Sequence, residues 1–98
     1  MLDDKFTQIK SAINNDDSID EAKREKLLVL SAELEKELNE LEKTHQQQSH
    51  VIADHTHQTI AQSSPETVSG LKETVREFEV SHPNLTRIVQ TLCAQFGV

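Results

Sequence analysis

A leucine stripe between residues 18 and 44 constrains the fold of this chain more than any other feature. The other faces are almost wholly Glu, Lys and Arg. The leucines recur at steps of three and four residues: Leu27, Leu30, Leu34, Leu38 and Leu41. This spacing places them along one face of a long amphipathic helix. The seam runs for about three heptads, a length that favours a helical hairpin or bundle over an extended coiled coil.

Residues 1–44 are predicted to form an amino-terminal pair of helices. The first helix is expected to end at the polar run 14–17. Four residues form its apolar side: Leu2, Phe6, Ile9 and Ile13. Ser18 and Glu21 have the spacing of a capping box, which predicts the start of the second helix at Ser18. Asp20 and Arg24 lie four residues apart and are expected to form an ion pair along that helix.

Residues 45–64 form a polar connection rich in His and Gln. Val51, Ile52 and Ile60 give only a faint helical stripe, so the sequence leaves open whether this segment is helix or loop. It holds four of the five histidines: His45, His50, His55 and His57.

Residues 65–98 are predicted to form a carboxy-terminal pair of helices. Ser64 as cap and Pro65 at the first position mark a helix start. Gly70 weakens this helix unless a neighbour packs closely against it. Pro83 forbids its continuation, so a last helix capped by Ser81 or His82 is expected to end at Gly97. The whole chain is therefore predicted to be one all-α domain, a small bundle of about four helices.

Composition limits what such a chain can do. It has 98 residues, of which 35% are apolar, with no Trp or Tyr. A core this thin favours completion by self-association, with a dimer as the first expectation and the leucine stripe as the main seam, closed by apolar residues of the carboxy-terminal pair. The formal charge of −7 opposes contact with nucleic acids and anionic lipid.

The expected location of the protein in the cell follows from its amino terminus, its apolar runs and its cysteine content. The amino terminus has acids where a signal peptide carries bases, and no run approaches the roughly 20 apolar residues that span a bilayer. Cys93 is the only cysteine, so it has no partner for an internal disulfide. These features predict a cytoplasmic protein.

A resemblance is carried by the far end of the chain. The string F-E-V-S-H-P-N-L at 78–85, followed by Ile88, Leu92 and the ending Phe-Gly-Val, resembles a family of short bacterial proteins, domain of unknown function DUF4404. The family pattern ends in Met-Gly-Ile instead, and it does not include the His-rich middle. The resemblance implies a bacterial cytosolic origin and provides no catalytic residues to transfer. The family-like corner comprises Phe78, Ser81, His82, Pro83 and Leu85.

Three side-chain groups are candidate sites. The histidines His45, His50, His55 and His57 suit Zn, Ni or Cu, but steps of five rotate His45, His50 and His55 away from one another on a helix. His82 could act as a base, although a structural role at the helix corner is favoured. Cys93 is expected to be a small buried hydrophobe.

The resulting functional hypothesis is a non-enzymatic, self-associating interaction or adaptor module that needs no cofactor. The alternative is a metal-binding or metal-sensing module that uses the stretch His45–His57. A third hypothesis is an acidic protein that competes for a nucleic-acid-binding partner.

Overall fold

The computed structural model describes residues 2–62 and 64–96. Over these ranges the chain forms five α-helices and one short 3-10 turn: α1 (Leu2–Asn15), α2 (Glu21–Glu42), α3 (Gln46–Gln62), α4 (Pro65–Val75), η1 (Arg76–Phe78) and α5 (Pro83–Ala94). The prediction of an all-α fold is confirmed. There are five helices rather than about four because the polar connection, which the sequence left undecided, is itself the helix α3.

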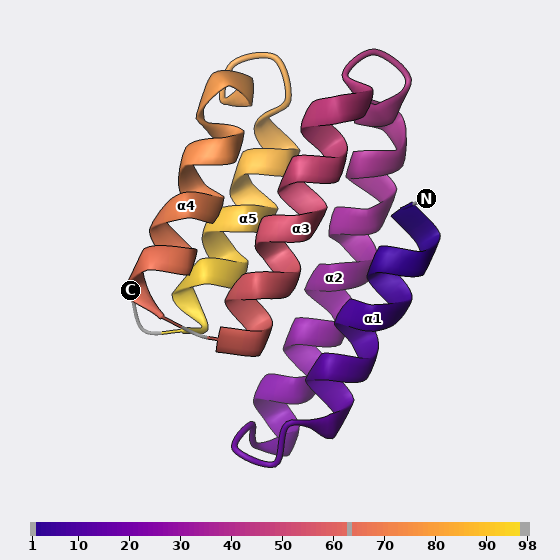
Figure 1. Ribbon diagram of the computed structural model, residues 1–98. Helices are drawn as coiled ribbons and strands as arrows, with labels where there is room; N and C mark the ends of the chain where they lie inside the picture. The colour runs from indigo at the N-terminus through magenta and orange to yellow at the C-terminus, as the bar shows by residue number, and fades with distance from the viewer. Residues whose placement is uncertain (1, 63, 97–98) are drawn as a thin grey trace.

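Successive helices run in opposite directions, so each of the five helices crosses the bundle once (Figure 1). α2, α3, α4 and α5 form a ring in which α2 contacts α3, α3 contacts α4, α4 contacts α5, and α5 returns to α2. α1 lies outside this ring, packed against both α2 and α3. The two helices α2 and α3 therefore each touch three others and form the centre of the molecule.

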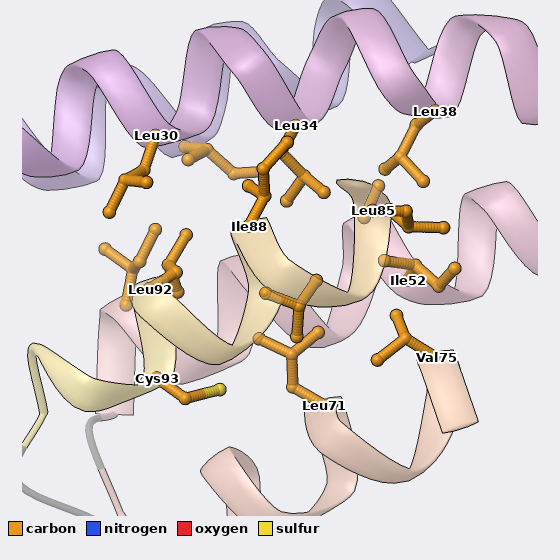
Figure 2. Close-up of a cluster of buried hydrophobic side chains, with 14 of the residues drawn as sticks. Leu30, Leu34, Leu38, Ile52, Leu71, Val75, Leu85, Ile88, Leu92 and Cys93 are labelled. Atoms are coloured by element: carbon orange, nitrogen blue, oxygen red, sulfur yellow. The ribbon is translucent and has the colours of Figure 1, made fainter. Parts of the chain in front are cut away.

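The leucine stripe of α2 faces inward. Leu30 is 6% exposed, and Leu27, Leu34, Leu38 and Leu41 are fully buried. Figure 2 shows Leu30, Leu34 and Leu38 opposite the α5 side chains Leu85, Ile88 and Leu92. The stripe that the sequence assigned to a self-association seam thus lies in the core of one chain, because α1, α3 and α5 surround α2 and bury its leucines without a second copy.

The turn between α1 and α2 differs from the sequence prediction in two details. Ser18 does not cap α2: its amide and hydroxyl bond to the Asp16 carboxylate, and Asp20 is the cap, accepting from the Lys23 amide at 2.8 Å. Arg24 does not pair with Asp20. Its guanidinium donates instead to four carbonyl oxygens at 2.5 to 3.1 Å, those of Ile13, Asn14, Asp16 and Ile19. Arg24 thereby satisfies carbonyl groups that the end of α1 leaves free.

Helix α3 buries small and hydroxyl-bearing side chains where α2 buries leucines. Its buried residues are Ser49, Ile52, Ala53, Thr56, Thr59 and Ile60. The buried hydroxyls donate to carbonyls one turn back in the same helix, as Thr56 does to Ile52 at 2.8 Å and Ser49 does to Gln46 at 2.7 Å. Because each hydroxyl has a partner, α3 can be packed on three sides without leaving polar groups unpaired.

The start of α4 is as predicted. Ser64 is the cap and accepts from the Thr67 amide at 3.2 Å, and Pro65 occupies the first position. Thr59 of α3 donates a bond of 3.1 Å to the Thr67 carbonyl, which joins the two helices directly.

Candidate functional site

The family-like corner lies at the end of the bundle where α4 passes through η1 and a short turn into α5. Phe78, the last residue of η1, is 3% exposed, and Leu85 in the first turn of α5 is 1% exposed. Pro83 is exposed at the first turn of α5. Val80, in the turn between η1 and α5, is 95% exposed. The corner thus anchors two apolar side chains inward and presents an uncovered valine at its tip.

His45 comes to this corner from the other connection at the same end, between α2 and α3. The His45 and Phe78 ring centroids are 5.3 Å apart, those of Phe78 and His82 are 5.6 Å apart, and those of His45 and His82 are 6.4 Å apart. All three pairs meet edge to face, an arrangement that aromatic rings favour. The cluster of His45, Phe78 and His82 joins the two connections.

His45 and His82 are each hydrogen-bonded to the side-chain hydroxyl of the preceding residue. Thr44 Oγ1 lies 2.9 Å from His45 Nδ1, and Ser81 Oγ lies 2.9 Å from His82 Nδ1. His82 occupies the cap position of α5, but its side chain makes no capping bond; its carbonyl accepts from the Thr86 amide at 3.3 Å. His82 is thus at one of the two predicted cap positions, but its ring makes no capping bond and lies in the cluster with Phe78 and His45.

The sequence presents His45 and His82 as separate candidates. A local signal was present: each histidine follows a hydroxyl residue at a junction between predicted helices, as Thr44-His45 and Ser81-His82. That repetition does not by itself say that the two junctions meet. Their meeting depends on α3 being a helix that returns the chain antiparallel to α2.

A groove of about 530 Å³ lies beside this corner, between the start of α3 and the end of α4. The α3 side contributes Gln47, Gln48 and the partly exposed Val51, and the α4 and η1 side contributes Glu73, Thr74, Arg76 and Glu77. Arg76 is paired with Glu73 at 3.3 Å. The lining thus combines amide and hydroxyl groups, two acids and one base around a valine. Such a lining can meet both the backbone and an apolar side chain of a peptide segment.

The other proposed metal ligands have different surroundings. His50 Nε2 lies 2.7 Å from Glu42 Oε2 of α2, and the His55 ring lies against Gly70 of α4. His57 is half-buried on α3. Over the ranges 2–62 and 64–96, no three His, Cys, Asp or Glu side chains lie close enough together to hold a metal ion.

Gly70 and Cys93 each have a packing role. A Cβ at Gly70 would come within 3.2 Å of His55 Nδ1, so the glycine admits this ring between α3 and α4. Cys93 is fully buried in α5, and its Sγ lies 3.9 Å from the Val68 carbonyl oxygen. Burial raises the pKa of the Cys93 thiol, which keeps it in the protonated, weakly nucleophilic form.

The fold and this corner define a small all-α bundle of five antiparallel helices with a histidine–phenylalanine cluster at one end. The family model described as Domain of unknown function (DUF4404) matches residues 2–96, so the chain belongs to this family. No curated protein and no solved structure matches the chain. Within the described ranges, none of the helices has the length and apolar character required to traverse a bilayer.

Proposed function

We propose that this protein is a non-enzymatic, cytoplasmic interaction module that associates with itself and binds a further protein partner. The observation that carries the partner-binding part is the placement of the α3–α4 groove directly beside the family-like corner. The groove offers hydrogen-bonding groups around Val51, and the corner offers Val80 in full exposure. A polar surface with one or two apolar anchors is typical of a protein interface that forms and dissociates.

Self-association is supported by composition. A chain of 98 residues with 35% apolar content is near the size at which a single core gives only modest stability. A second copy that binds only the folded chain stabilises the folded state by mass action. Light scattering of the purified chain tests this part, and a folded monomer at all micromolar concentrations would contradict it.

The partner-binding part is tested with a matched pair of variants. Val51→Asp places a charge in the groove, and Val29→Asp makes the same change at an exposed position of α2 that does not line the groove. Tagged wild type and both variants are used to capture proteins from a cell lysate. We expect a protein that the wild type and Val29→Asp retain and Val51→Asp loses, because a buried unpaired charge opposes binding.

The Val29→Asp control distinguishes binding through the groove from binding through general surface properties. A protein lost equally from both variants is bound through general surface properties, which would contradict a role for the groove. If the captured protein binds nucleic acid, competition with that nucleic acid is the next measurement, since the chain carries a net charge of −7.

A further inference from the structure

Helix α1 is an addition to a ring that closes without it. Each of α2, α3, α4 and α5 contacts its two neighbours in the ring, and α5 returns to α2. α1 contacts only α2 and α3, from outside (Figure 1). Within the described residues, the connection 16–20 joins it to α2.

The contact between α1 and the ring is strongly apolar. Leu2 is 3% exposed, and Phe6, Ile9 and Ile13 are fully buried. These four side chains recur along one face of α1, so they fill the groove between α2 and α3 as one continuous row. Removing α1 would expose this groove to water, which is unfavourable for apolar surface. Any segment that replaces α1 in this groove must therefore bring the same row of apolar side chains, and α1 of a second copy does so.

Two ion pairs fix the position of α1 along the groove. Lys5 Nζ lies 3.1 Å from Asp54 Oδ1 of α3, and Lys10 Nζ lies 3.6 Å from Glu35 Oε1 of α2. The first binds α1 to one wall of the groove and the second to the other. Both would form unchanged if α1 came from another copy, because the residues that meet are the same.

The connection between α1 and α2 is the only part that would have to change. It comprises residues 16–20 and is held by the Asp16–Ser18 bonds and by the Arg24 guanidinium. The Asp16–Ser18 bonds and the Arg24 bonds to Asp16 and Ile19 lie within the connection or join it to the first turns of α2, so opening it disturbs neither the ring nor the groove. Arg24 also donates to the Ile13 and Asn14 carbonyls at the end of α1, and these two bonds would have to form with α1 of the other copy. Exchange of identical elements across such a connection is a low-cost route to a dimer.

We propose that the self-association suggested above, on which this inference rests, occurs by exchange of α1: α1 of one copy fills the α2–α3 groove of the other. Monomer and dimer then bury the same side chains and differ in the connection, so concentration during folding decides between them. The leucines of α2 remain in the core of each ring in both forms.

The Lys5–Asp54 pair provides a direct test. Equal amounts of unlabelled and nitrogen-15-labelled protein are unfolded together, refolded at high concentration, and separated by size with light scattering. The dimer is treated with a carbodiimide, which joins a lysine to a contacting carboxylate, and the Lys5–Asp54 cross-link is examined by mass spectrometry. Exchange predicts that about half of these cross-links join one labelled and one unlabelled chain.

The outcomes separate the exchange from self-association itself. A dimer whose Lys5–Asp54 cross-links always carry one label overturns the exchange and leaves self-association standing. A monomer at every concentration overturns self-association and the exchange with it.

Deletion of residues 16–18 provides a second measurement. It removes the Asp16–Ser18 turn, so the shortened connection hinders α1 from folding back onto its own ring. We expect this variant to be a dimer with mixed-label cross-links at concentrations where the wild type is monomeric. A folded, monomeric deletion variant would contradict the exchange.

Discussion

Helices α2 and α3 occupy equivalent places in the bundle with opposite kinds of buried surface. Each packs against three other helices. α2 buries five leucines and one serine, whereas α3 buries two isoleucines among serine, alanine and threonine. The helix with the strongest sequence pattern and the helix with the faintest one are therefore equally central. Hydrophobic periodicity reports the size of the buried side chains on a helix more than the extent of its burial.

The difference follows from how the two helices make contact. Large leucines fill the space between α2 and its neighbours. Small residues on α3 let neighbouring backbones come close, and the hydroxyls of Ser49 and Thr56 return to carbonyls of their own helix. The Thr59 hydroxyl is shared between the His55 carbonyl of α3 and the Thr67 carbonyl of α4. A buried threonine whose hydroxyl is bonded in this way presents mainly its methyl group to the neighbouring helices.

The largest effect is expected from Leu34→Asp in α2. Leu34 is fully buried, and truncating such a leucine to alanine alone costs about 2 to 5 kcal/mol. An unpaired buried charge costs more, which is comparable to the whole stability of a small domain. We expect this variant to lose its helical circular dichroism signal. Val29→Asp on the exposed side of the same helix, where the valine is 60% exposed, should remain folded.

Arg24→Met tests whether α2 contributes only through its leucines. The change removes the donors to four carbonyl oxygens and keeps most of the apolar stem. We expect a loss of about 2 kcal/mol in the free energy of unfolding by urea titration, since bonds from a charged group are strong but these are partly solvated. Lys26→Met, at an exposed position two residues on, is the control. Equal effects of the two substitutions would mean that the carbonyl contacts of Arg24 contribute nothing.

Substitutions of Thr56 test whether α3 needs small side chains or polar ones. Thr56 is fully buried. Thr56→Leu should overfill the contact and lower the free energy of unfolding by about 1 to 3 kcal/mol. Thr56→Val keeps the shape, and the Ile52 carbonyl retains its backbone bond, so a change below about 1 kcal/mol is expected. If valine proved more damaging than leucine, the hydroxyl bond rather than size would be what α3 requires.

Gly70→Ala in α4 should have the smallest effect. Alanine is favoured over glycine within a helix by about 1 kcal/mol. The added Cβ would meet His55 Nδ1 at 3.2 Å, so the ring must shift and part of that gain is lost. We expect a net change within about 0.5 kcal/mol in thermal unfolding. In a His55→Ala background the same substitution should recover the full gain, and a failure to do so would show that His55 does not limit this contact.

The sequence predicted those features that depend on neighbouring residues. The inward face of α2, the cap at Ser64 and the break before α5 at Pro83 all follow from local spacing and are found where expected. The cap at Asp20 was missed because Ser18 and Asp20 both have side chains that can cap, and the choice depends on the turn that Arg24 holds closed.

Features that depend on distant residues could not be predicted in the same way. An apolar stripe indicates that a face is buried, but it does not say whether the covering surface belongs to the same chain. The sequence therefore favoured a second copy as the cover of the α2 leucines, with carboxy-terminal residues closing the seam, whereas α5 of the same chain lies over Leu30, Leu34 and Leu38 (Figure 2). The cluster of His45 with His82 was missed for the same reason, since its members are 37 positions apart in the sequence, with α3 and α4 between them.

The closure of the ring has a consequence for the order in which the chain is synthesised. α5 is made after α2, α3 and α4, yet it is the helix that lies over Leu30, Leu34 and Leu38 (Figure 2). Until residues 83–94 have left the ribosome, these leucines lack the cover that α5 gives them in the complete bundle. A nascent or interrupted chain thus displays an apolar row of the kind that chaperones bind and proteases act on. Once α5 has folded onto α2, this row of leucines is buried, so exposure of the row distinguishes an incomplete chain from the finished protein.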